Sequence, residues 1–383
     1  MKATLPRNIL IAPDKFKGTL SAGEAGRAMA LGVIEPLFPV SPRIDVRPLA
    51  DGGEGSLELL GEYRAELEKK SFRGTDPDGG EFACEYLQKD EIFLETARAI
   101  GLGLPDMQDK PFLKRDTHRV GIFLARALAG ELSDSPPRAV SLFLGGSATC
   151  DGGFGLARAL GFRFLDSSGG RLVSLADLDR LDRIEPPPPP PPRGVAIRLY
   201  LDVQNPLLGP GGAPALFAPQ KGATPGETEF LESALERLDA VFASFSGRRR
   251  ADVPGAGAAG GLALPLLHWA HPELLSGADF FIEEAGLPEL FRADRPDLVL
   301  TGEGCTDRGT LAGKIPYRLT ELCRRENGPP CLVVSGGIRD REELKKAGLE
   351  NLYAADGPGS DPGERLTNAV ARSLASFLNR EEP

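Results

Sequence analysis

Cysteine and histidine are scarce in this sequence, and neither residue type is spaced for a metal site. The five cysteines form no Cys-x-x-Cys pair, and such scattered single residues are typical of free thiols in a reducing compartment. The only histidines are His118, His268 and His271. His268 and His271 have the spacing of one helical face, but no third ligand is near in the sequence. We therefore expect them to be a packed surface pair.

The sequence also lacks an excess of positive charge and any long apolar run. Lysine and arginine total 45 against 55 acidic residues, and the net charge of −10 argues against a nucleic-acid partner. The basic cluster at 248–250 is short and predicts a solvated loop or helix end. No apolar run approaches the ~20 residues of a membrane span. Residues 1–7 lack the apolar core of a signal peptide. We therefore expect a cytoplasmic protein with no membrane partner.

Several enzyme signatures are missing too. The absence of a Gly-x-Ser-x-Gly elbow and of a His-Glu-x-x-His motif disfavours serine hydrolases and zinc proteases. The glycine loop, His-Arg-Asp and Asp-Phe-Gly motifs of protein kinases are absent as well.

Glycine, by contrast, is abundant. There are 47 glycines among 383 residues, and this is roughly 12% against a usual ~7%. Fourteen of them lie in five short loop segments, at 12–19, 50–56, 145–153, 255–261 and 301–307, and a sixth segment at 202–207 has no glycine but adds a carboxylate and an amide. Glycine lets a backbone approach a ligand closely, N–H groups at a helix start attract anions, and carboxylates suit Mg²⁺. Together these segments predict a phosphoryl-transfer site built from the whole chain.

The order of predicted elements indicates two α/β domains. A strand at 8–12, a helix opened by the capping box Ser21-Ala-Gly-Glu24 and a strand at 44–49 are typical of a parallel sheet. Strands at 64–73, 81–87 and 91–96, with an Asp-Gly hairpin signal at 78–79, predict an antiparallel meander. The parallel rhythm returns at 297. We expect a domain formed by residues 1–73 and 288–383 with a mixed α/β domain inserted at 74–287. The prolines at 186–192 predict an extended surface loop.

The N-terminal glycine segments supply the first candidate residues. Lys15 and Lys17 could hold phosphates or a substrate carboxylate, and Asp14 could hold a metal or accept a proton. The segment 51–55 has two carboxylates among three glycines, which is more than an ordinary helix cap requires.

The later segments add a phosphate loop and further charges. Residues 145–155 leave a strand and open a helix in the manner of a phosphate loop, although no Walker A ending follows. Residues 255–260 match Gly-x-Gly-x-x-Gly literally. Because no buried strand precedes them, close approach to a ligand or another helix is favoured over a dinucleotide site. The loops at 202–206, 219–222 and 301–307, and Lys314 at the start of a helix, add carboxylates, amides and lysines.

Taken in order, these segments resemble the bacterial type I glycerate kinase family. The matching motifs run from Ile11-Ala-Pro-Asp-Lys-Phe-Lys-Gly-Thr to Gly313-Lys-Ile-Pro, through 50–55, 145–149, 202–209, 217–223 and 253–261. The resemblance implies ATP-dependent phosphorylation of D-glycerate on its 2-hydroxyl, which gives 2-phosphoglycerate and ADP. It also implies a flavodoxin-like domain carrying an inserted mixed α/β domain. The family's usual residues are replaced at Cys150, at 116–121 and at Cys305-Thr306, and the last two replacements lie in polar loops that we expect to influence affinity.

These observations lead to a hypothesis of in-line phosphoryl transfer in which positioning and charge neutralisation supply most of the reduction of the activation barrier. The catalytic candidates are Asp14 and Asp307 as proton acceptors and Lys15, Lys17 and Lys314 as charge partners. Mg²⁺ is expected on Asp51, Asp202 and Glu303, with Glu54 as a further candidate. The substrate- and nucleotide-binding candidates are Asp51, Gly52, Gly53, Glu54, Gly145, Gly146, Ser147, Asp151, Asn205, Gln220, Lys221, Gly255, Gly257 and Gly302.

The sequence leaves alternatives open. The phosphorylated group could be the 3-hydroxyl, the acceptor could be a related small hydroxy acid, or the chain could be a nucleotide-binding regulator without catalysis. Retention of the acidic motif residues argues against the regulator. The oligomeric state, including a homo-oligomer, is left open.

Overall fold

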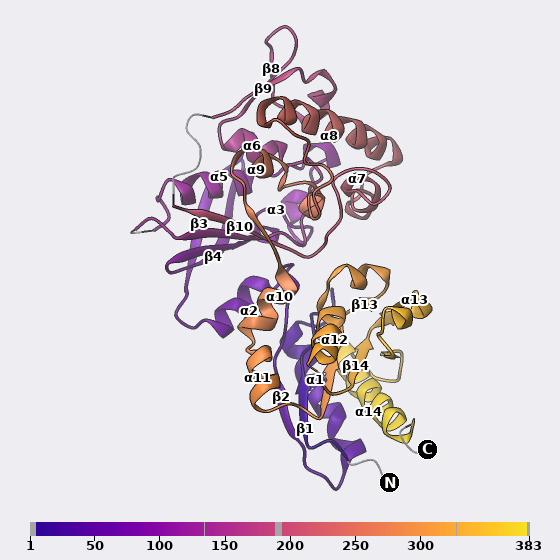
Figure 1. Cartoon of the computed structure of the whole chain (residues 1–383). Helices are drawn as coiled ribbons and strands as arrows, with labels where there is room; N and C mark the ends of the chain where they lie inside the picture. Colours follow the sequence, from indigo (N-terminus) through magenta and orange to yellow (C-terminus); the bar gives the residue numbers. More distant parts are fainter. Residues whose placement is uncertain (1–4, 134, 188–193, 327, 381–383) are drawn as a thin grey trace. The chain divides into compact units, whose positions relative to one another are not determined.

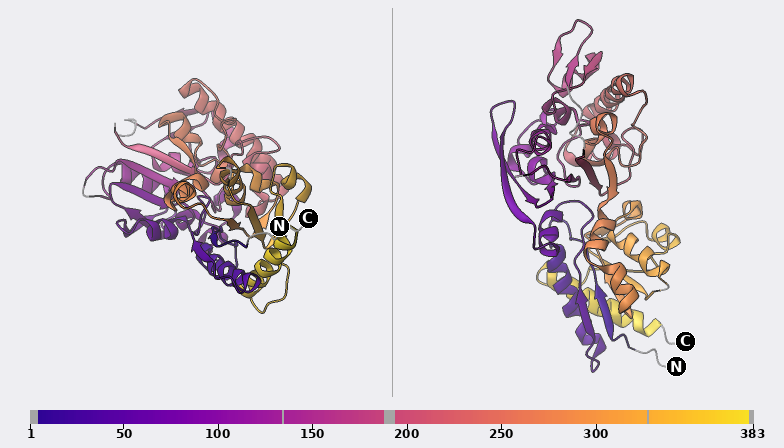
Figure 2. Two further views of the ribbon diagram at one scale, coloured as in Figure 1. Left: turned by 60° about the horizontal axis from the view of Figure 1, so that its bottom comes forward. Right: turned by 60° about the vertical axis from the view of Figure 1, so that its left-hand side comes forward.

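The computed structural model describes residues 5–133, 135–187, 194–326 and 328–380. By internal contacts the chain divides into two compact units, one formed by residues 1–51 and 277–383 and the other by 52–276. Most of the predicted proline loop at 186–192 lies outside the described residues. Figures 1 and 2 show the elements of each unit, coloured along the sequence.

The first unit is built on a fully parallel five-stranded sheet. Its strands are β1 (Asn8–Ile11), β2 (Arg43–Val46), β12 (Leu298–Thr301), β14 (Cys331–Ser335) and β16 (Asn351–Ala354). Their spatial order is β16-β14-β12-β1-β2. Counted within the unit, this is the 2-1-3-4-5 order of flavodoxin-like sheets. The expected flavodoxin-like architecture is therefore confirmed.

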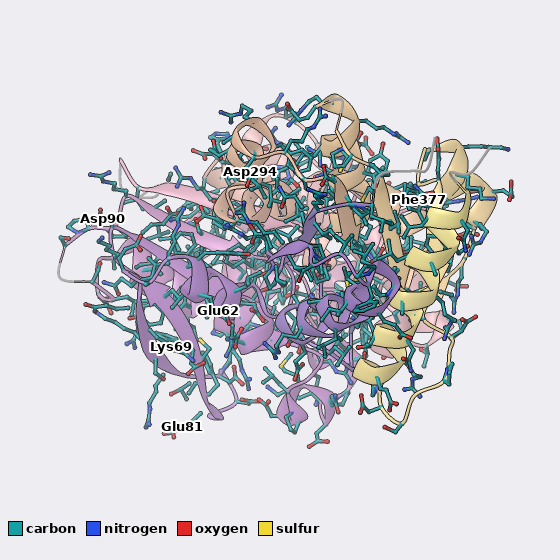
Figure 3. The ribbon with its side chains drawn as sticks, turned by 90° about the horizontal axis from the view of Figure 1, so that it is seen from below. Glu62, Lys69, Glu81, Asp90, Asp294 and Phe377 are labelled. Atoms are coloured by element: carbon teal, nitrogen blue, oxygen red, sulfur yellow. The ribbon has the colours of Figure 1, made fainter. Side chains whose placement is uncertain are left out.

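Helices cover both faces of this sheet because its strands are apolar on both sides. On one face, α1 (Ala22–Leu37) and α14 (Pro362–Arg380) pack side by side over Ile9, Leu300 and Val334. Phe377 on α14 belongs to the same core (Figure 3). The remaining elements of the unit are α10 (Gly277–Glu284), α11 (Leu287–Ala293), β13 (Cys305–Thr306), α12 (Ile315–Arg325), β15 (Gly337–Ile338) and α13 (Arg341–Lys346).

The second unit contains a mixed six-stranded sheet in the order β11-β10-β6-β5-β4-β3. The bounds are β3 (Glu68–Thr75), β4 (Glu81–Gln88), β5 (Glu91–Glu95), β6 (Ala139–Phe143), β10 (Ala196–Leu201) and β11 (Glu273–Ser276). β5, β6, β10 and β11 run parallel, whereas β3 and β4 form the expected antiparallel hairpin. Lys69 and Glu81, on its two strands, are labelled in Figure 3.

One face of this sheet buries the main hydrophobic core of the chain. The core lies against α5 (His118–Leu128), α6 (Phe154–Ala159), α8 (Pro225–Ser246) and α9 (Leu264–Trp269). The smaller elements are α3 (Ala97–Ile100), α4 (Pro105–Gln108), β7 (Arg163–Leu165), β8 (Arg171–Leu172), β9 (Arg183–Glu185) and α7 (Ala213–Leu216). β8, β7 and β9 form a separate small sheet.

Helix α2 (Ser56–Tyr63) belongs to the second unit by its contacts, although the sequence analysis assigned it to the first domain. It packs against β4 and β5. In addition, the Glu95 carboxylate at the end of β5 accepts hydrogen bonds from Gly55 N–H and Leu57 N–H, both at 3.1 Å. Residues 277–287 lie in the first unit by the same criterion. These units are defined by contacts alone, so the domain boundaries inferred from the sequence stay a prediction.

Candidate active site

The first group of candidate residues lies where the order of the parallel sheet reverses, between β1 and β12. Ligands of open α/β sheets bind at the carboxyl ends of strands at such a point. Asp14 follows β1, and its N–H donates to Gly302 O, just after β12, at 2.9 Å. A Cβ on Gly302 would lie 1.9 Å from Val334 O in β14, so only glycine allows the chain after β12 to pass this close to the neighbouring strand. The fold thus holds the segments after β1 and β12 together.

Three carboxylates interact electrostatically at this position. The Asp14 side chain is buried, and its pKa is raised well above the ordinary value by burial and by the charges of Asp51 and Glu303. Lys15 opposes this shift. Its Nζ lies 3.6 Å from Asp51 Oδ1. Because the charges of Asp51 and Glu303 raise the pKa of Asp14, a cation bound beside these carboxylates would be stabilised by them.

Glu303 is held by a separate set of partners. Its Oε1 accepts hydrogen bonds from Thr310 Oγ1 at 2.6 Å and Thr306 Oγ1 at 3.1 Å, and its Oε2 lies 3.7 Å from Lys314 Nζ. Burial raises the pKa of the Glu303 carboxyl, while Lys314 and both threonines act to lower it. These contacts fix the carboxylate's orientation without neutralising it.

Two further catalytic candidates have different surroundings. Lys17 is exposed. Asp307 caps the short 3-10 helix at Arg308–Ala312, because its Oδ1 accepts Gly309 N–H at 2.8 Å. The capping role accounts for a carboxylate at this position without catalysis, and it makes Asp14 the stronger candidate for the proton acceptor.

The second group of candidates, in the other unit, surrounds the loop after β6. Lys221 Nζ donates to Ser147 Oγ at 3.0 Å and to Thr149 O at 2.7 Å, so the lysine and the loop form one structure. Gly146 has a φ of +79°. A Cβ on Gly145 would come within 2.9 Å of Asp202 Oδ2, which places this metal candidate beside the loop. The Thr149 hydroxyl is buried and has no partner among the described residues.

Asp151 anchors the base of this loop from inside the protein. Its fully buried carboxylate accepts hydrogen bonds from Thr117 N–H, Thr117 Oγ1 and Gly155 N–H at 2.8 to 2.9 Å. Burial and the charge of Asp116 raise the pKa of Asp151 to about 6 against the lowering effect of these bonds. The geometry shows a role in holding the loop, and direct contact with a ligand stays a prediction.

The glycine segment at 255–261 packs against the two neighbouring loops. Gly257 N–H donates to Asn205 O at 3.0 Å, and Gly152 N–H donates to Gly260 O at 3.0 Å. A Cβ on Gly257 would lie 2.2 Å from Pro206 O. Close packing of backbones thus explains these glycines. Of the remaining candidates, Gln220 and Glu54 are exposed, whereas Gly52 and Gly53 are buried.

The replaced family positions lie mainly inside the protein. Cys150 is buried, and burial raises the pKa of its thiol to about 12. Thr117 of the 116–121 segment is fully buried against Asp151. Cys305 is partly exposed and pairs with Gly337 in a short two-stranded ladder. Among the replaced positions, the partly accessible side chains are those of Asp116, His118 and Cys305.

Sequence reasoning missed Glu95, Thr306 and Thr310. Glu95 directly follows the apolar run of β5, but no glycine-rich segment of the kind that contains Asp14 and Glu303 surrounds it. The two threonines carry no such signal, because only the fold brings their hydroxyls to Glu303.

A flavodoxin-like sheet with buried carboxylates and lysines at its switch point places the protein among the α/β ligand-binding enzymes. The model of the glycerate kinase family matches residues 9–376. A glycerate kinase of Halalkalibacterium halodurans is 33% identical over 96% of this chain and 97% of its own length. The glycerate 2-kinase of Escherichia coli K12 is 32% identical over 87% of this chain and 86% of its own length.

A solved structure gives the same result. A crystal structure described as glycerate kinase 2 from Salmonella typhimurium LT2 superposes with a TM-score of 0.67 at 28% identity, covering 98% of this chain and 99% of that one. The chain therefore belongs to the glycerate kinase family, and the resemblance carried by its motifs is confirmed. No helix in the described part of the chain is both long enough and apolar enough to span a membrane.

Proposed function

We propose that this protein transfers the γ-phosphoryl group of ATP to the 2-hydroxyl of D-glycerate, giving 2-phosphoglycerate and ADP. The observation that carries the proposal is the group of Asp14, Asp51 and Glu303 with Lys15 and Lys314 at the switch point of a flavodoxin-like sheet, in a chain of the glycerate kinase family. The relative in Escherichia coli named glycerate 2-kinase supports the choice of the 2-hydroxyl.

Asp14 is the proposed acceptor of the hydroxyl proton. Burial and two nearby carboxylates raise the pKa of Asp14, and a base with a pKa nearer the working pH is more effective. Lys15 and Lys314 would offset the charge of the phosphates and of the glycerate carboxylate. Lys17 and Asp307 are kept as weaker candidates for these two roles.

The carboxylates have the ligand chemistry that Mg²⁺ prefers. Within the described residues, no group of three or more side chains is arranged to hold a metal ion by itself. This fits Mg²⁺, which is usually bound through one or two carboxylates together with substrate phosphates and water. Asp51 and Glu303 would hold the ion in the first unit, and Asp202 is the candidate in the second. When bound, Mg²⁺ would neutralise charge on the phosphates.

The loop at 145–149 is the proposed phosphate cradle. It follows the carboxyl end of β6, and Lys221 Nζ donates hydrogen bonds to its Ser147 hydroxyl and to Thr149 O. The Thr149 hydroxyl is buried and has no partner among the described residues. Main-chain N–H groups and a lysine are suited to phosphate oxygens. The expected setting is the cytoplasm, with small molecules as the only partners proposed.

The test is ³¹P NMR of the products formed by the purified protein with ATP, Mg²⁺ and D-glycerate. A 2-phosphoglycerate signal is expected. A 3-phosphoglycerate signal would keep the kinase and overturn the position of transfer. ATP binding without a phosphorylated product would favour another hydroxy acid, or a nucleotide-binding regulator if a panel of such acids also fails.

A further inference from the structure

A serine, a histidine and an aspartate that the proposed phosphoryl transfer does not use form a hydrogen-bonded chain at the end of α8. Ser246 Oγ lies 2.6 Å from His268 Nδ1, and His268 Nε2 lies 3.0 Å from Asp239 Oδ1. The Asp239 and His268 side chains are fully buried, while Ser246 is partly exposed. The expected surface pair of His268 and His271 is therefore wrong: His268 is an interior residue, and α9 ends before His271.

The rest of the cluster fixes the histidine and the charge of the aspartate. The His268 ring stacks on Phe242 with centroids 5.1 Å apart and an interplanar angle of 14°. Asp239 Oδ1 also accepts Arg250 N–H at 2.9 Å, and Arg249 Nη1 lies 3.4 Å from Oδ2. Burial acts to raise the pKa of Asp239, but the hydrogen bonds from His268 and Arg250 outweigh it and lower that pKa. The aspartate is therefore ionised at neutral pH.

The charge state of Asp239 determines the tautomer of the histidine. An ionised carboxylate only accepts hydrogen bonds, so His268 Nε2 must carry a proton and donate it to Asp239. In the neutral imidazole, Nδ1 then has a free lone pair that faces Ser246 Oγ. The serine hydroxyl donates to it at 2.6 Å, a shorter contact than its alternative at 3.3 Å to Arg248 O. A nucleophile, a base and a group that orients the base are the signature of an activated serine.

The surroundings of Ser246 suit an electrophile that becomes negatively charged. Arg248 and Arg249 follow Ser246 closely in the chain and are exposed, Arg249 Nη1 contacts Glu236 O and Asp239, and Arg250 has a buried Nε with no hydrogen-bond partner among the described residues. Unused donors and positive charge stabilise an oxygen on which negative charge develops. Phe245, the residue before Ser246, is 41% exposed and adds apolar surface at this end of α8.

We propose that Ser246 is a nucleophile that takes an acyl group from small activated esters, with His268 as its base and Asp239 as the orienting group. In the step, the Ser246 O–H proton passes to His268 Nδ1 while Oγ forms a bond to the ester carbonyl carbon. The bond from that carbon to the leaving alcohol oxygen breaks, and the leaving group takes the proton from His268. Water then hydrolyses the acyl-serine by the same exchange. No oxidant, reductant or metal is needed.

The experiment treats the full-length protein with p-nitrophenyl acetate, follows the burst of p-nitrophenolate and locates the acetyl adduct by peptide mass spectrometry. The matched control is Ser244, an exposed serine on the same helix whose Oγ donates to Ala240 O at 3.3 Å. We expect an adduct on Ser246 at least about tenfold faster than on Ser244, because base assistance gives roughly 10²-fold or more. The burst should disappear in Ser246→Ala and persist in Ser244→Ala.

Asp239→Asn keeps the shape of the orienting group and removes its charge, so the burst rate should fall about tenfold or more. If this variant does not fold, Ser246→Ala alone decides, and its melting temperature and kinase activity show that the fold is retained. An adduct on Ser246 that forms no faster than on Ser244, or a burst that survives Ser246→Ala, would overturn the proposal and leave a purely structural contact.

Discussion

Lys314 and Thr310 both contact the Glu303 carboxylate, and the short 3-10 helix at Arg308–Ala312 lies between Glu303 and Lys314 in the chain. Lys314 Nζ lies 3.7 Å from Oε2, while Thr310 Oγ1 lies 2.6 Å from Oε1. Lys314 is the last residue before α12, and Glu303 follows β12. The short 3-10 helix between them thus sets the distance of a positive charge from the switch point of the sheet.

Lys314→Met should therefore reduce phosphoryl transfer. Removing a preorganised charge partner from a site of this kind typically costs about 10²–10³ in kcat. The measurement is ADP release at saturating ATP and glycerate. Lys345→Met is the matched control, because Lys345 is exposed on α13 and only 3.7 Å from the exposed Glu342. Equal activity of both variants would remove Lys314 from the site.

Asp14→Asn should abolish most activity and make the protein more stable at neutral pH. The pKa of Asp14 is raised in the folded state, so folding costs free energy when the carboxylate is ionised. That cost vanishes as the pH falls below the ordinary pKa and is fully present once the pH exceeds the raised one. The amide removes this cost, and it also removes the base, which contributes roughly 10²–10⁴ to the rate.

Two measurements check this prediction. Thermal melts at pH 7 should show a higher melting temperature for Asp14→Asn, and Asp90→Asn, an exposed residue labelled in Figure 3, should leave it unchanged. In the wild type, kcat/KM should fall as the pH falls through the raised pKa of Asp14. An active Asp14→Asn enzyme with the same acidic limb would show that another residue accepts the proton.

Local sequence signals predicted much of the fold because several elements contain their own start and stop information. The capping box of Ser21 and Glu24 opens α1 as predicted, and the Asp78-Gly79 signal lies at the turn between β3 and β4. The start of the final helix at Pro362 has no such signal, since its first turn is polar and shows no apolar period before Leu366. Such ends depend on capping contacts that the spacing of apolar residues does not reveal.

The candidate site was predictable to the extent that it follows strand ends. Asp14 and Glu303 were found because each lies in a glycine-containing segment that follows a predicted strand. The sequence did not predict that these two carboxylates interact, because their interaction depends on β1 and β12 being neighbours in the sheet. These strands end at Ile11 and Thr301, which are 290 residues apart in the chain. His268 was placed on the surface for the same reason: its partner Asp239 is distant in the sequence and on a different helix.

Thr117→Val should destabilise the second unit through the anchor of the phosphate loop. The Thr117 hydroxyl donates to Asp151 at 2.8 Å and accepts Leu156 N–H at 2.9 Å. Removing it leaves a buried carboxylate and a buried N–H short of one partner each, at a cost of about 1–3 kcal/mol. Urea denaturation measures the change. Thr228→Val, which loses only an exposed bond to Thr224 O at 3.1 Å, should cost much less.

Gly257→Ala should be strongly destabilising, although alanine adds only one carbon atom. The new Cβ would lie 2.2 Å from Pro206 O and 3.1 Å from Asn205 O, and both are main-chain atoms that move only with their loop. Overpacking of this kind costs about 1–3 kcal/mol or more. Because the displaced loop begins at Asp202, the KM for ATP or glycerate should rise as well.

Gly226→Ala is the matched control for that substitution. Gly226 lies in the first turn of α8, and a Cβ there meets nothing within 4 Å. Alanine is favoured over glycine in helices by roughly 0.5–1 kcal/mol, so this variant should be equally or more stable. If both variants have the urea midpoint of the wild type, the loop at 255–261 accommodates the added carbon without loss of stability. Its glycines are then better explained by close approach to a ligand than by packing.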